Sequence, residues 1–70
     1  MKTEIYNDPK YCYNEIRIAR DIFTSEKLFT QEKAELLLKG LIMMLVYCPE
    51  ELRIPIEATI KEIEIRRAYI

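Results

Sequence analysis

The chain contains an unbroken apolar run at residues 41–48, Leu41-Ile42-Met43-Met44-Leu45-Val46-Tyr47-Cys48. In a helix, such a run places apolar side chains on every side of the cylinder, and each side then has to be covered. Two neighbouring helices in a small bundle leave one side of a central helix open. The run therefore predicts a buried central helix with a leftover apolar face, which would pack on a second copy or on a foreign protein.

The helix that carries this run is bounded by local signals. Thr30 is a good N-cap, and Phe29 and Ala34 on either side of it are spaced as a hydrophobic staple. Pro49 ends the helix, because the residue before a proline is pushed away from helical geometry. We therefore expect a helix over about residues 30–47.

A first helix is predicted over about residues 9–23. Asp8 can cap its free backbone N–H groups, and Pro9 suits the first helical position. Apolar residues then recur at spacings of four, three and four, which aligns them on one face. That face comprises Cys12, Ile16, Ala19 and Phe23.

A last helix is predicted over about residues 55–69. Pro55 inside a helix would lack a hydrogen bond and clash with the preceding turn, so we expect a short turn after Pro49 and a helix that begins at Pro55. A rival interpretation takes residues 62–66 as an alternating strand paired with residues 3–6. Two acid-first pairs at a spacing of four favour the helix, Glu57/Lys61 and Glu62/Arg66.

Together these patterns predict an all-α fold, a small three-helix domain that spans residues 1–70. A chain of this length buries only about 60% of the surface that it exposes when unfolded, so a lone monomer would be marginally stable. Two cysteines are too few for a disulfide framework, and without histidine they cannot form a common zinc site. A second subunit is the expected source of stability, and we predict a homodimeric helical bundle.

The expected contact surface lies on the last two helices. The predicted oligomer or partner interface comprises Leu41, Met44, Leu45, Tyr47, Ile56, Ile60 and Ile63. Gly40 disfavours a helix by about 1 kcal/mol relative to alanine. It either marks a close helix crossing or is simply tolerated.

The residue types needed for common catalysis are missing. Ser25 is the only serine and histidine is absent, which excludes the usual triads. Cys12 and Cys48 fall on apolar faces, where cysteines are reduced and inert. A single glycine cannot build a phosphate-binding loop. We expect no enzyme, no catalytic residue, no metal and no cofactor.

The charge pattern does not indicate a particular class of partner. The net charge is -1, with 11 basic and 12 acidic residues, and their intermixing gives no polyanion-seeking surface. The arginine pairs, with tyrosines near them in the sequence, are compatible with phosphate contacts, but glutamates of the last helix disfavour nucleic acid. These pairs are Arg17/Arg20 and Arg66/Arg67.

The sequence thus favours a non-catalytic protein-protein interaction module, a homodimeric regulator, inhibitor or adaptor of an unidentified protein. The alternatives are a small nucleic-acid-binding transcriptional regulator and a structural subunit of a larger assembly. The apolar stretch over residues 36–48 is shorter than the roughly 20 residues of a membrane span, and the polar start lacks the features of a signal peptide. We expect a cytoplasmic protein without a membrane partner, with a composition suited to an AT-rich bacterial or phage genome.

Overall fold

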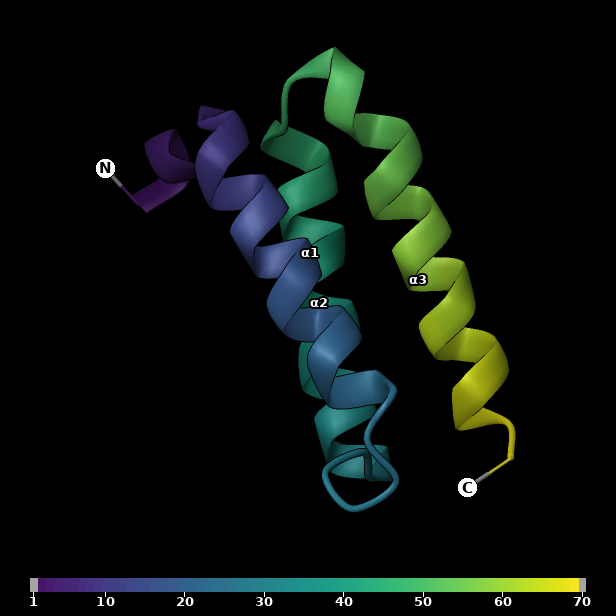
Figure 1. Ribbon diagram of the computed structural model, residues 1–70. Helices are drawn as coiled ribbons and strands as arrows, with labels where there is room; N and C mark the ends of the chain where they lie inside the picture. Colours follow the sequence, from purple (N-terminus) through teal and green to yellow (C-terminus); the bar gives the residue numbers. More distant parts are fainter. Residues whose placement is uncertain (1, 70) are drawn as a thin grey trace.

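Three helices dominate the computed structural model, which describes the backbone of residues 2–69 and the side chains of residues 5–69. They are α1 (Pro9–Phe23), α2 (Gln31–Tyr47) and α3 (Arg53–Arg67), with 3-10 turns η1 (Lys2–Asn7) and η2 (Glu50–Leu52). The helices run alternately down, up and down, and α3 lies against both α1 and α2 (Figure 1). The predicted all-helical fold is confirmed, and the rival strand is wrong because residues 62–66 lie within α3.

The first two helices begin where their capping residues predict. The Asp8 carboxylate accepts a hydrogen bond of 3.0 Å from the Lys10 backbone N–H, and Pro9 follows as the first residue of α1. The Thr30 hydroxyl accepts a hydrogen bond of 3.2 Å from the Lys33 backbone N–H at the start of α2. Each cap satisfies an N–H group that has no partner inside its helix.

The third helix corrects the predicted boundaries, because it begins at Arg53 instead of Pro55 and ends at Arg67 instead of residue 69. Pro55 lies in the first turn of α3, where backbone N–H groups have no intrahelical acceptor. A proline there gives up no hydrogen bond, so the expected break does not occur.

The core lies where the three helices meet. All four residues of the predicted α1 face are buried in it, and α2 and α3 contribute Met44, Ile56 and Ile63 among others. The rings of Phe23 and Phe29 meet edge to face, with centroids 6.4 Å apart, beside the α1–α2 connection. Among residues 2–69, none of the helices combines the length and the hydrophobicity of a membrane span.

Candidate protein interaction surface

The other helices leave one side of α2 uncovered, and apart from Lys39 the side chains at its centre are apolar. The exposed fraction is 64% for Leu36, 50% for Met43 and 67% for Val46. Gly40 and Tyr47 are exposed on the same side of the helix. We call these five residues, Leu36, Gly40, Met43, Val46 and Tyr47, the outer α2 face.

The structure divides the seven predicted interface residues among different environments. Leu41, Met44, Ile56 and Ile63 are buried in the core of the single chain, so they offer no surface to a partner. Leu45 and Ile60 are partly buried against that core. Of the seven predicted residues, Tyr47 lies on the outer α2 face.

Sequence reasoning missed Leu36, Met43 and Val46 as surface residues. A helix with polar residues on one side reveals its buried side through that periodicity, but residues 41–48 are apolar all round. The sequence therefore predicts that a face is left over without showing which one. In the first half of α2, the spacing of Ala34 and Leu38 does indicate a buried side, but residues 41–48 carry no periodicity that would extend this orientation.

A groove between α1 and α2 borders the outer α2 face. It has a volume of about 140 Å³, and its lining includes Tyr6, Ile18, Leu37 and Gly40. A Cβ atom added at Gly40 would meet no side chain and no other element of the described structure within 4 Å. The Tyr6 ring stacks on Tyr47, with centroids 6.0 Å apart, and so joins the groove to the outer α2 face.

The polar group of this groove is the pair Tyr11 and Glu15. The Tyr11 hydroxyl donates a hydrogen bond of 3.2 Å to the Glu15 carboxylate. Burial raises the pKa of Tyr11, and the negative charge of Glu15 raises it further. Tyr11 therefore stays protonated and acts here as a hydrogen-bond donor instead of a base.

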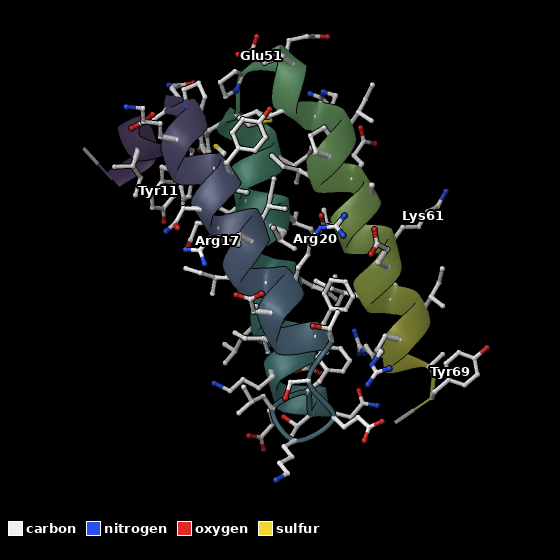
Figure 2. All side chains as sticks on the ribbon, viewed as in Figure 1. Tyr11, Arg17, Arg20, Glu51, Lys61 and Tyr69 are labelled. Atoms are coloured by element: carbon white, nitrogen blue, oxygen red, sulfur yellow. The ribbon has the colours of Figure 1, made fainter. Side chains whose placement is uncertain are left out.

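A second and wider groove lies between α2 and α3 on the other side of α2. Its volume is about 570 Å³, and its apolar lining comprises Ile42, Leu45, Ile54, Ala58 and Ile60. Charged residues, including Lys61 on the outward side of α3, stand at its rim (Figure 2). The apolar surface centred on α2 therefore extends to both flanks of the helix.

The two thiols are held by backbone carbonyl groups. The Cys12 Sγ donates a weak hydrogen bond to the carbonyl of Tyr6 at 3.2 Å, and the Cys48 Sγ approaches the carbonyl of Leu45 at 3.5 Å. Both cysteines are free, and burial raises the pKa of the Cys12 thiol. A buried, protonated thiol is a poor nucleophile. No cluster of three or more metal-binding side chains occurs among the described residues.

The two arginine pairs of the sequence are compatible with phosphate contacts, but three of these four arginines lie near a carboxylate. Arg17 lies 3.8 Å from Asp21, and Arg67 lies 3.7 Å from Glu35. Arg20 reaches from α1 towards α3 and pairs with Glu62 at 3.0 Å (Figure 2). The spacing of four predicted that Glu62 pairs with Arg66 in the same helix. In the structure Glu62 pairs across helices instead, because α1 brings the guanidinium of Arg20 to it.

The described surface thus offers apolar contact area flanked by charged rims, an arrangement that can bind another protein by removing that area from water. No family model, no curated protein and no solved structure matches the chain.

Proposed function

We propose that this chain is a non-catalytic protein-protein interaction module that works as a homodimeric regulator, inhibitor or adaptor, with the outer α2 face as its contact surface. The observation that carries the proposal is the exposure of Leu36, Met43 and Val46 on a helix whose opposite side is buried in the core. Exposed apolar side chains gathered in this way are typical of interaction sites.

The surface area of the single chain supports the same proposal. Its accessible surface is 5182 Å², whereas a globular monomer of 8.4 kDa exposes roughly 4600 Å². The excess of roughly 600 Å² approaches the area of about 800 Å² that each partner buries in a stable interface. A partner that covered about this much surface would remove the excess.

The arginine contacts favour a protein partner over nucleic acid. Arg17, Arg20 and Arg67 each lie within 4 Å of a carboxylate. Phosphate contacts would have to compete with these acids, and the acids themselves repel a polyanion. We therefore advance no nucleic-acid function.

Sedimentation equilibrium at micromolar concentration tests the proposal. We expect a mass near twice 8.4 kDa for the unchanged protein. Val46→Lys should shift the equilibrium to the monomer, because a charge introduced beside the apolar contact has to be desolvated without a partner. Since Val46 is exposed in the single chain, the variant should retain its helical circular dichroism spectrum.

Tyr13→Lys is the matched control, because Tyr13 is also an exposed apolar residue but lies on α1 outside the outer α2 face. This variant should dimerise as the unchanged protein does. A mass of one chain at every concentration would overturn the homodimer. A dimer that Val46→Lys leaves intact would overturn the assignment of its surface.

A further inference from the structure

Four residues on α2 form a stripe with the spacing of a coiled coil. Leu36, Gly40, Met43 and Tyr47 recur at intervals of four, three and four residues, which is the pattern by which one helix packs along another. All four are exposed in the single chain. We call these four residues the α2 seam. The seam is the outer α2 face without Val46, which lies beside it.

Nothing within the described single chain requires a glycine at position 40. No described side chain or neighbouring element lies within 4 Å of the position of an added Cβ, and no glycine has a positive φ. Alanine at this position would stabilise the helix, because glycine is the poorer helix former. The absence of a side chain at the middle of the α2 seam is instead suited to the close approach of something from outside.

We propose that two copies of the chain pair their α2 helices in antiparallel orientation, with Met43 of each copy seated against Gly40 of the other. This inference rests on the homodimer proposed above and specifies its register. In a twofold interface, if one residue contacts a second, the second contacts the first across the axis. A register that opposes Gly40 to the partner's Met43 therefore also opposes Leu36 to the partner's Tyr47.

The sizes of the side chains favour this register. Each Met43 faces a gap, because it lies over Gly40 of the other copy, which has no side chain. A parallel pair in register would place Gly40 against Gly40 and Met43 against Met43, which leaves a void in one layer and crowds the next. The antiparallel arrangement fills both layers equally.

The groove beside Gly40 has the capacity for such a side chain. Its volume is about 140 Å³, and a cavity of roughly 150 Å³ accommodates a molecule the size of benzene. Methionine is flexible and fits irregular apolar spaces. At the end of the seam, the partner's Leu36 would meet Tyr47, whose ring is backed by Tyr6 at 6.0 Å.

A swap of large and small residues tests the register. Gly40→Leu should raise the dimer dissociation constant by about tenfold or more, since the new side chain collides with Met43 of the partner subunit. Met43→Ala should also raise it by about tenfold, because it leaves a void over Gly40. The double variant Gly40→Leu/Met43→Ala exchanges the two sizes and should return to within about threefold of the unchanged protein.

Sedimentation equilibrium gives the dissociation constants, and circular dichroism checks that each variant is folded. The space around Gly40 is open in the single chain, so Gly40→Leu should fold. Tyr13→Leu, which changes an exposed α1 residue to leucine outside the seam, is the control and should leave the dissociation constant unchanged.

The outcomes separate this inference from the function on which it rests. If the unchanged protein is a monomer, both proposals fail. If it is a dimer that Gly40→Leu does not weaken, the function stands and the register is overturned. The register is also overturned if both single variants weaken the dimer and the double variant is no better than either of them.

Discussion

Arg20 of α1 donates a hydrogen bond of 3.0 Å to the carboxylate of Glu62 in α3. The two residues are far apart in the sequence, and their contact ties the first helix to the last. The side chains are 48% and 42% exposed, so water and salt screen the pair. It therefore orients the two helices more than it stabilises them.

The contribution of this pair can be measured by a double-mutant cycle. Arg20→Gln and Glu62→Gln should each lower the free energy of unfolding by less than about 1 kcal/mol, with a coupling of about 0.2–1 kcal/mol that decreases in high salt. Urea denaturation of the four proteins gives the coupling energy. A coupling that persists unchanged in high salt would show that the pair is shielded from solvent, contrary to its exposure here.

The core face of α3 is tested by two isoleucines that are two positions apart. Ile63 is fully buried, whereas Ile65 is 60% exposed. Ile63→Ala should lower the free energy of unfolding by about 2–5 kcal/mol, because it opens a cavity in the core. Ile65→Ala is the matched control and should change it by no more than about 0.5 kcal/mol. Equal effects in thermal or urea denaturation would mean that α3 is rotated about its axis.

Thr59 is the buried polar residue among the described side chains. Its hydroxyl donates a hydrogen bond of 2.8 Å to the carbonyl of Pro55, one turn earlier in the same helix. Thr59→Val keeps the shape and removes both the bond and the need to bury a hydroxyl group, so the net effect should lie within about 1 kcal/mol. Thr59→Ser, which instead deletes the buried methyl group, should destabilise by about 1 kcal/mol. A loss of several kcal/mol for valine in urea denaturation would contradict this environment for Thr59.

The buried thiol predicts a loss of stability at alkaline pH. Burial raises the pKa of Cys12 above its ordinary value of 9.0 in the folded chain. Unfolding then makes the thiol easier to ionise. The contribution of the protonated Cys12 thiol to the free energy of unfolding is therefore fully present below about pH 9, and it is lost as the pH rises through the folded-state pKa. Between about pH 8 and pH 10, Cys12→Ala should lose less stability than the unchanged protein, as measured by urea denaturation. A steeper loss of stability in the variant than in the unchanged protein would contradict the raised pKa of Cys12. The loss that the variant still shows includes the contribution of Tyr11, whose pKa is also raised.

The parts of the fold that the sequence alone determined depend on near neighbours. The caps at Asp8 and Thr30 act on N–H groups only two or three residues away, and the spacing of the apolar residues of α1 fixes its buried side. The starts of α1 and α2 and the core face of α1 could therefore be predicted. The end of α2 before Pro49 could be predicted for the same reason.

Only the tertiary structure decided which side of α2 is buried. Met43 and Met44 are identical neighbours in the sequence, yet Met43 is 50% exposed and Met44 is 1% exposed. A run that is apolar all round carries no periodicity to distinguish them, so the positions of α1 and α3 make the choice. The partner of Glu62 depended likewise on the approach of α1, which brings Arg20 to it. These features arise from contacts between distant segments, and a local pattern of residue types does not encode such contacts.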